Sequence, residues 1–134
     1  MLNLNEGPGM RKILVIIGAC LNIVWGMAHI FPTGNVVKSF GNITVNNKQI
    51  LLMEWLNESL TLNFIGILVL VTVIIEKENT KLRKAVFGLA ASMLFSMAVL
   101  SLFTGFRINF LPYKLCPLIF SISGAFILQG IFIK

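Results

Sequence analysis

Hydrophobic residues along this chain gather into four long runs, residues 13–31, 50–75, 85–104 and 115–133. Each run approaches or exceeds the ~18 to 20 residues that an α-helix needs to cross the hydrocarbon of a bilayer. A helix of a water-soluble protein would carry a polar face at helical spacing, and these runs mostly lack one. The pattern predicts an all-α integral membrane protein, an antiparallel bundle of four transmembrane helices in a single domain, residues 1–134. The helices are expected at about residues 11–31, 50–75, 85–104 and 113–133.

Residues 32–49 connect the first two apolar runs and form the longest of the connections between the four runs. Pro32 and Gly34 disfavour continuation of the first helix into this segment. The dipeptide Gly41-Asn42 stands between two short apolar stretches and suits a tight hairpin turn. A short interfacial helix is the competing interpretation, so the sequence predicts an outer loop with one of these two structures.

Charged residues are few, and most of them lie at the ends of the apolar runs. Hydrophobic residues make up 57% of the chain and charged residues 12%, with a formal net charge of +6. The basic residues form no single patch with interleaved aromatic residues, which argues against nucleic acid as a partner. They divide into two groups by side, with Arg11, Lys12, Lys77, Lys81, Arg83, Lys84 and Lys134 on the side of the amino terminus and Lys38, Lys48, Arg107 and Lys114 on the other. Because cytoplasmic segments carry the excess of Lys and Arg, this asymmetry predicts that both termini face the cytoplasm, across the plasma (cytoplasmic) membrane.

Ionisable side chains inside a spanning helix are costly and therefore call for a functional or structural explanation. Here they are His29, late in the first helix, and Glu54 and Glu58, early in the second. At about 100° per residue, each helix carries one narrow stripe that holds these residues. The stripes consist of Gly18, Asn22, Gly26 and His29 on the first helix and Glu54, Glu58, Thr61 and Thr72 on the second.

The two stripes match in depth if the first two helices are antiparallel neighbours. Pairs at equal depth then have a nearly constant sum of residue numbers. The expected pairs are His29 with Glu54, Asn22 with Thr61, Gly18 with Ile65 and Gly26 with Glu58. Small residues opposite larger ones let helices approach closely in lipid. Gly66 and Asn63 lie off the polar stripe of the second helix and are not expected to join the cluster.

We predict a ligand-binding cluster near the outer ends of the helices, made of His29, Glu54, Glu58, Arg107, Trp25, Asn22 and Thr61. Arg107 either completes the cluster from the short connection after the third helix or extends its guanidinium to lipid head groups. Cys20 and Cys116 lie at different depths and are interpreted as packing residues rather than a disulfide. The sequence assigns no catalytic residue and no metal ligand, and it leaves the cofactor unknown.

Three functions stay open for this cluster, and the bilayer is the one partner that composition itself implies. The first is an outward-facing pocket that binds or carries a small or lipid-like ligand, with proton coupling if a carboxyl group titrates with the ligand. The second is an accessory role, in which histidine and glutamates only fix helix packing within a homo-oligomer or a larger membrane assembly. The third is a membrane-embedded enzyme, metal-dependent or acid-base, although no catalytic signature accompanies the cluster.

Overall fold

The computed structural model describes residues 8–39, 41–76, 78, 80–105 and 111–133. Within these ranges the chain is helical and forms no strand, which confirms the prediction of an all-α protein. The helices are α1 Pro8–Ile30, α2 Thr33–Ser39, α3 Val45–Ile75, α4 Lys81–Gly105, α5 Leu111–Leu128 and the 3₁₀-helix η1 Gln129–Phe132.

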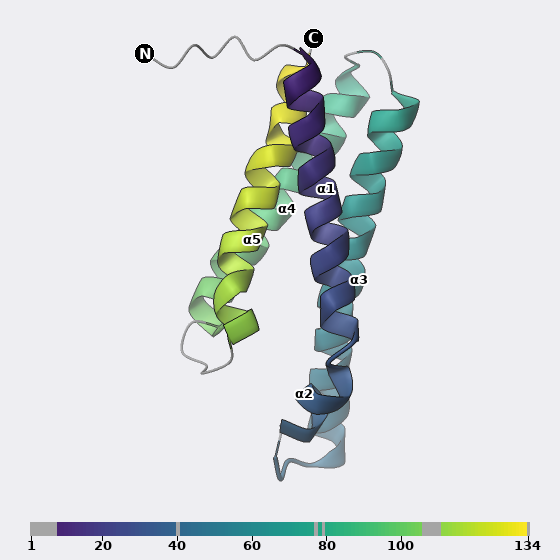
Figure 1. Ribbon diagram of the computed structural model, residues 1–134. Helices are drawn as coiled ribbons and strands as arrows, with labels where there is room; N and C mark the ends of the chain where they lie inside the picture. The colour runs from purple at the N-terminus through teal and green to yellow at the C-terminus, as the bar shows by residue number, and fades with distance from the viewer. Residues whose placement is uncertain (1–7, 40, 77, 79, 106–110, 134) are drawn as a thin grey trace.

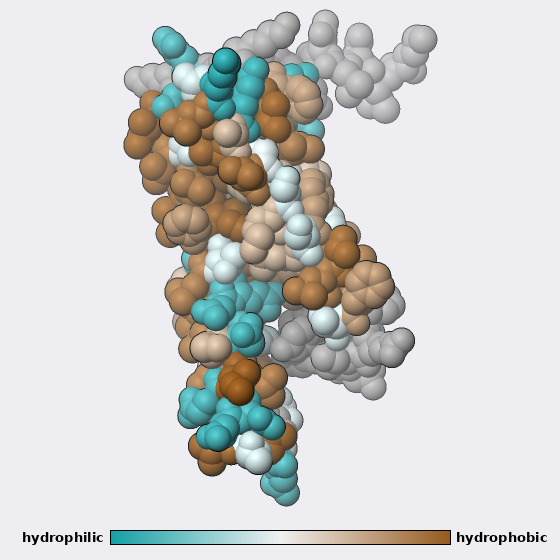
Figure 2. Space-filling model, turned by 180° about the vertical axis from the view of Figure 1, so that it is seen from behind, coloured by the Kyte–Doolittle hydropathy of each residue, from teal (hydrophilic) through white to brown (hydrophobic). Residues whose placement is uncertain are grey.

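Among the described residues, four helical segments are long and apolar enough to cross a membrane, as predicted. They are Gly9–Ile30, Val45–Ile75, Lys81–Gly105 and Lys114–Phe132. Large hydrophobic side chains on these helices face outward, and Val24, Phe64, Leu89 and Phe103 are each more than 60% exposed. Figure 2 shows hydrophobic surface over much of the molecule, with hydrophilic surface gathered at its ends and in a patch in the lower half. Apolar surface of this extent is unusual on a soluble monomer and suits contact with lipid chains.

The longest helix, α3, reaches beyond its neighbours. Its 31 residues span about 46 Å, more than the ~30 Å of bilayer hydrocarbon. Figure 1 shows the first turns of α3 extending past the lower ends of α4 and α5, with α2 beside them. The helix begins at Val45, earlier than the predicted start at residue 50, because Thr44 caps it. The Thr44 hydroxyl accepts a hydrogen bond from the backbone N–H of Asn47 at 3.3 Å.

The connection between α1 and α3 contains a short helix, and the hairpin alternative is wrong. Helix α2 begins directly after Pro32, whose carbonyl accepts a hydrogen bond from the backbone N–H of Val36 at 3.0 Å. The Val36 side chain is buried, so α2 is fixed to the rest of the fold. Gly41 has a φ of +67°, a left-handed conformation that glycine adopts without strain. It therefore turns the chain toward α3, and residues 42–44, which follow it, form no strand.

Helix α1 packs chiefly against α3 and α5, and it also contacts η1. Helix α4 packs chiefly against α5, and α3 and α4 contact each other only sparsely. The buried core follows these contacts and includes Val15, Ala19, Leu62, Val69, Phe87, Leu94, Phe120 and Ile127. At the start of α1, the Arg11 guanidinium donates a hydrogen bond to the carbonyl of Phe132 at 2.6 Å. The beginning of α1 and the 3₁₀-helix η1 therefore lie at the same end of the molecule (Figure 1).

Small residues form the contact between α1 and α3. The Ser59 hydroxyl donates a hydrogen bond to the Gly26 carbonyl at 2.7 Å. A Cβ atom added at Gly66 would lie only 2.7 Å from the carbonyl oxygen of Ala19, so the two backbones nearly touch there. Gly66, which lies off the predicted polar stripe, therefore belongs to the contact, because the smallest side chains decide where two helices approach most closely.

Gly18 faces a different helix from the one that the sequence suggested. The nearest atoms to a Cβ at this position are the Ser123 carbonyl oxygen and the Phe126 Cβ of α5, at 2.9 and 3.0 Å. The Ser123 hydroxyl also donates a hydrogen bond to the Gly18 carbonyl at 2.7 Å. The predicted pair of Gly18 with Ile65 is therefore wrong: Gly26 faces α3, whereas Gly18 faces α5.

Candidate functional site

His29 lies in the last turn of α1, and only 4% of its surface is exposed. Its ring stands between two indole rings, with centre-to-centre distances of 5.5 Å to Trp25 and 4.9 Å to Trp55. Its Nδ1 lies 2.8 Å from the carbonyl oxygen of Trp25, one turn earlier in the helix. Because a carbonyl oxygen only accepts hydrogen bonds, Nδ1 carries a proton in this contact. In the neutral ring, Nε2 then presents a lone pair.

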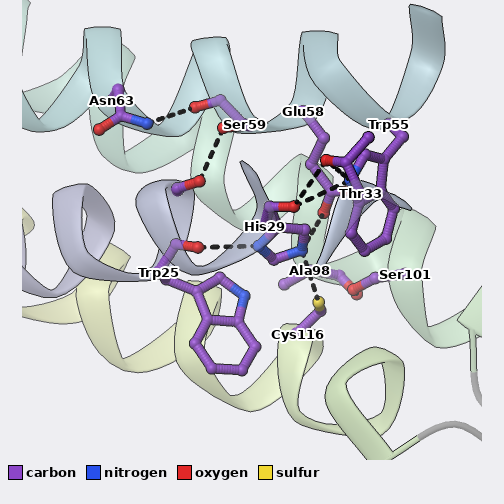
Figure 3. Close-up of polar contacts among 11 residues, drawn as sticks. Trp25, His29, Thr33, Trp55, Glu58, Ser59, Asn63, Ala98, Ser101 and Cys116 are labelled. Carbon is purple, nitrogen blue, oxygen red and sulfur yellow. Dashed lines mark hydrogen bonds and ion pairs between the residues drawn. The ribbon is translucent and has the colours of Figure 1, made fainter. Parts of the chain in front are cut away.

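The Nε2 of His29 is directed toward side chains from two other helices (Figure 3). It lies 3.9 Å from Glu58 Oε1 of α3 and 3.9 Å from Cys116 Sγ of α5. One ligand-type atom from each of the three residues lies within 4.8 Å of the other two, and we call this set the triad. His29 and Cys116 are buried, whereas the Glu58 side chain is 25% exposed. Glu58 is therefore the member of the triad that a solute reaches most easily.

Trp55 fixes the backbone beside the triad. Its indole N–H donates a hydrogen bond to the His29 carbonyl at 2.9 Å and approaches the Thr33 hydroxyl oxygen at 3.1 Å. The Thr33 hydroxyl donates in turn to the Ile30 carbonyl at 2.7 Å. The last carbonyls of a helix have no partner within the helix, so these bonds satisfy the end of α1. They also tie α1, α2 and α3 together next to the His29 ring.

A cavity of about 380 Å³ lies beside the triad. Its walls come from α3 (Leu51, Glu54, Trp55, Asn57, Glu58 and Thr61), α4 (Met93, Met97, Leu100, Ser101 and Thr104) and α5 (Cys116 and Phe120). Glu58 and Cys116 belong both to the triad and to the cavity wall. The triad therefore borders the cavity, with His29 behind these two side chains.

The structure brings His29 together with Glu58 and Trp25, as the predicted cluster requires. The carboxyl grouped with His29 is Glu58, and Glu54 lies on the exposed rim of the cavity. The predicted pair of His29 with Glu54 is therefore wrong. The prediction fails because of the rotation of α3 about its axis, which turns Trp55 toward α1 and leaves the glutamates at the edge of the contact between these helices.

Three other residues, Thr61, Asn22 and Arg107, belong to the predicted cluster. Thr61 lines the cavity. Asn22 is fully buried, and within the described part of the chain neither polar atom of its amide has a hydrogen-bond partner. Asn22 and Thr61, which were predicted to face each other, therefore form no hydrogen bond between their side chains. Arg107 lies outside the described residues.

Cys116 is the site residue that the sequence analysis missed. Its interpretation as a packing side chain accounts for its burial but not for its position beside His29. The available signal was depth, because Cys116 stands near the start of the fourth apolar run, at the level of His29 at the end of the first. Depth alone does not tell which face of a helix a residue occupies, so the contact could not be predicted.

The triad combines an imidazole, a carboxyl group and a thiol, which are groups that exchange protons and bind metal ions. Since they come from α1, α3 and α5, the arrangement exists only when these three helices are packed together. Comparisons of the chain with protein-family models, with curated proteins and with solved structures find no match.

Proposed function

We propose that this chain is a multi-pass membrane protein whose outward-facing pocket binds a small or lipid-like ligand. In this proposal the four long helices form an antiparallel bundle in the plasma membrane, and both termini face the cytoplasm. The observation that carries the proposal is the cavity of about 380 Å³ beside a buried histidine paired with a partly exposed carboxyl group. Ligand sites in proteins commonly occupy 300 to 1,000 Å³ and combine apolar walls with a few polar groups.

The two sides of the cavity differ in polarity. Helix α3 contributes carboxyl groups from Glu54 and Glu58, whereas α4 contributes the flexible apolar side chains of Met93 and Met97. Thioether side chains adapt their shape to a bound apolar group. Among the described residues that line the cavity there is no lysine or arginine. This distribution supports an amphiphilic ligand with an apolar tail and a cationic or hydrogen-bond-donating head.

The sparse contact between α3 and α4 supports access from the side of the bundle. Several lining residues on these two helices, including Leu51, Met93 and Leu100, are exposed at the molecular surface. A ligand dissolved in the bilayer could therefore reach the cavity between these helices without passing through water. Lateral access favours a lipid-like ligand over a small hydrophilic one.

The charge distribution supports the orientation in this proposal, because seven of the eleven basic residues are expected on the side of the termini. With that orientation, the triad and the cavity belong to the outer half of the bilayer. If the ligand binds or leaves together with a proton, the His29 and Glu58 pair at 3.9 Å is the group that exchanges it. Transport would then be proton-coupled.

The proposal is tested with a bromine-substituted long-chain amine, because bromine quenches tryptophan fluorescence at short range. A Trp25→Phe background leaves Trp55, which lines the cavity, as the single tryptophan of the chain. In purified protein we expect saturable quenching of Trp55 by the amine. The corresponding brominated fatty acid should quench less, because its carboxylate meets Glu54 and Glu58.

Two neighbouring residues provide a matched pair of variants. Thr61→Phe fills the cavity and should abolish the saturable component, whereas Leu60→Phe changes a lipid-facing position that is 62% exposed and should retain it. Quenching that rises linearly with the amine, or that is equal in both variants, would overturn the proposal.

An accessory role is the second candidate, favoured by the hydrogen bonds of Trp55 and Ser59 to backbone carbonyls of α1. These bonds fix helix packing without any ligand. Glu58→Gln separates the two functions, since it keeps the volume of the side chain and removes its charge. Normal unfolding with lost amine binding supports a ligand site, and lowered stability with unchanged quenching supports the accessory role.

A further inference from the structure

The triad presents one nitrogen, one oxygen and one sulfur atom toward a common point. We propose that His29, Glu58 and Cys116 bind a divalent metal ion of the zinc class through His29 Nε2, one Glu58 carboxylate oxygen and the Cys116 thiolate. This inference stands on the geometry of the three side chains. It does not depend on the amphiphilic ligand proposed for the neighbouring cavity.

The first support is the orientation of the imidazole. In metal sites, the ring nitrogen that does not bind the metal usually donates a hydrogen bond to a carboxylate or a backbone carbonyl, which fixes the tautomer. His29 makes this contact through Nδ1, which donates to the Trp25 carbonyl at 2.8 Å. Its Nε2 lone pair is thereby directed toward Glu58 and Cys116, and the rings of Trp25 and Trp55 restrict rotation of the imidazole.

The second support is distance. Zinc lies about 2.0 Å from imidazole nitrogen and carboxylate oxygen and about 2.3 Å from thiolate sulfur. In a tetrahedral site these bond lengths separate the donor atoms by roughly 3.3 to 3.6 Å. The distances from His29 Nε2 to Glu58 Oε1 and to Cys116 Sγ are both 3.9 Å. Shifts of a few tenths of an ångström would bring each of these two pairs to the spacing of a tetrahedral site. All three donor atoms lie within 4.8 Å of one another, so the carboxylate and the thiolate would have to approach by up to about 1.2 Å, which rotation of the Glu58 side chain supplies.

The third support is charge. A carboxylate and a thiolate together carry two negative charges, which balance a divalent cation, while the imidazole binds in its neutral form. The net charge of the loaded site is then zero, which limits the cost of holding ions among apolar helices. On binding, the metal replaces the proton of the Cys116 thiol, and that proton passes to water. Softer sulfur and nitrogen donors favour zinc-class metals over magnesium or calcium, which prefer oxygen ligands.

Three protein ligands leave one position of a tetrahedral ion for another molecule, as in catalytic rather than structural zinc sites. Glu58 and Cys116 both line the cavity, and His29 lies behind them. The fourth position therefore faces the cavity, where a water molecule or the polar head of a ligand would occupy it. The triad thus has the composition of an accessible metal site rather than a closed structural one.

Cobalt(II) tests the proposal, because it substitutes for zinc and gives a sulfur-to-cobalt charge-transfer band in the near ultraviolet when it binds thiolate. We expect this band when one equivalent of Co²⁺ is added to the reduced full-length protein in detergent, and we expect Zn²⁺ to displace it. The two cysteines of the chain provide the control. Cys116→Ser should abolish the band, and Cys20→Ser, at an exposed position of α1, should leave it unchanged.

The oxygen ligand is tested with a second matched pair. Glu58→Gln should weaken Co²⁺ binding by more than about tenfold, since even losing an outer-sphere partner of a metal site costs roughly 10- to 100-fold. Glu54→Gln removes a carboxylate on the cavity rim, outside the triad, and should keep the affinity of the unaltered protein. Circular dichroism of each variant verifies that the helices remain folded.

The proposal is overturned if the unaltered protein shows no charge-transfer band at stoichiometric Co²⁺, or if Cys116→Ser retains it. Amine quenching of Trp55 after treatment with a chelator distinguishes this failure from that of the ligand site. Retained quenching without a metal band leaves the ligand site standing and removes the metal site. A metal band without saturable quenching leaves the metal site standing and removes the ligand site.

Discussion

Replacing Gly66 with alanine tests whether α1 and α3 approach as closely as the structure indicates. The added Cβ would lie 2.7 Å from the carbonyl oxygen of Ala19 and 2.6 Å from Cγ1 of Ile23. A comfortable contact between carbon and oxygen is about 3.3 Å, so the two helices must separate locally by about 0.6 Å. The carbonyl belongs to the backbone of α1 and cannot rotate away as the Ile23 side chain can. Overpacking of this kind costs about 1 to 3 kcal/mol.

Gly88→Ala provides the control for this substitution. Gly88 lies in α4, and a Cβ there would meet only Cδ1 of Ile131, at an ordinary contact distance of 3.6 Å. Both variants gain up to about 1 kcal/mol of helix propensity, so the difference between them isolates the steric cost at Gly66. We expect Gly66→Ala to unfold at lower denaturant concentration than the unaltered protein, and Gly88→Ala to match or exceed it.

Unfolding of the purified protein in detergent micelles by sodium dodecyl sulfate, followed by circular dichroism and tryptophan fluorescence, measures this difference. The tryptophan signal reports on the end of the contact near the triad, because Trp25 and Trp55 belong to α1 and α3. If the two glycine variants agree within about 0.5 kcal/mol, the ordinary range for surface substitutions, the close contact of α1 with α3 does not exist as described.

Two further predictions concern the end of the bundle next to α2 and the proposed orientation of the chain in the membrane. Trp55→Phe removes the indole N–H that is hydrogen-bonded to the end of α1 and should lower stability in the same assay by about 1 to 3 kcal/mol, and an unchanged unfolding curve would contradict this role. In a background without Cys20 and Cys116, Asn46→Cys should react with a membrane-impermeant maleimide on intact cells, whereas Lys84→Cys should react only after permeabilisation. The reverse pattern would contradict the proposed cytoplasmic position of both termini.

The four membrane-length helices could be predicted from the sequence because apolar length is a property of each segment by itself. The predicted start of α3 was less accurate, because a capping residue decides where this helix begins. The hydroxyl group of Thr44 lets α3 begin inside the polar connection. The structure of that connection depended on Val36, whose burial against the rest of the fold favours a helix over a hairpin. Such a tertiary contact leaves no periodic signal within the segment.

The contact between α1 and α3 could not be predicted by matching polar stripes. That approach assumes that polar side chains of one helix pair with polar side chains of the other, which would place Glu54 opposite His29. In lipid, close packing contributes as much as polar pairing, and small residues permit the closest approach. Ser59 and Gly66 therefore occupy the contact, and Glu58 reaches His29 from its edge.

The geometry of the triad depends on α1 touching two helices at once. Gly66 lets α3 approach α1, while Gly18 lets α5 approach it, with a Cβ at Gly18 only 2.9 Å from the Ser123 carbonyl. These two contacts position Glu58 and Cys116 at the same distance from His29 Nε2, 3.9 Å.

The distances from His29 to Glu58 and from His29 to Cys116, which we call two edges of the triad, should accordingly change when a glycine outside the triad is replaced. Gly66→Ala should chiefly lengthen the edge between His29 and Glu58, and Gly18→Ala the edge between His29 and Cys116. Loss of the sulfur-to-cobalt band in Gly18→Ala, with a weakened but visible band in Gly66→Ala, would link the metal affinity to helix packing. Equal bands in both variants and in the unaltered protein would mean that the three side chains find their positions independently of these two close contacts.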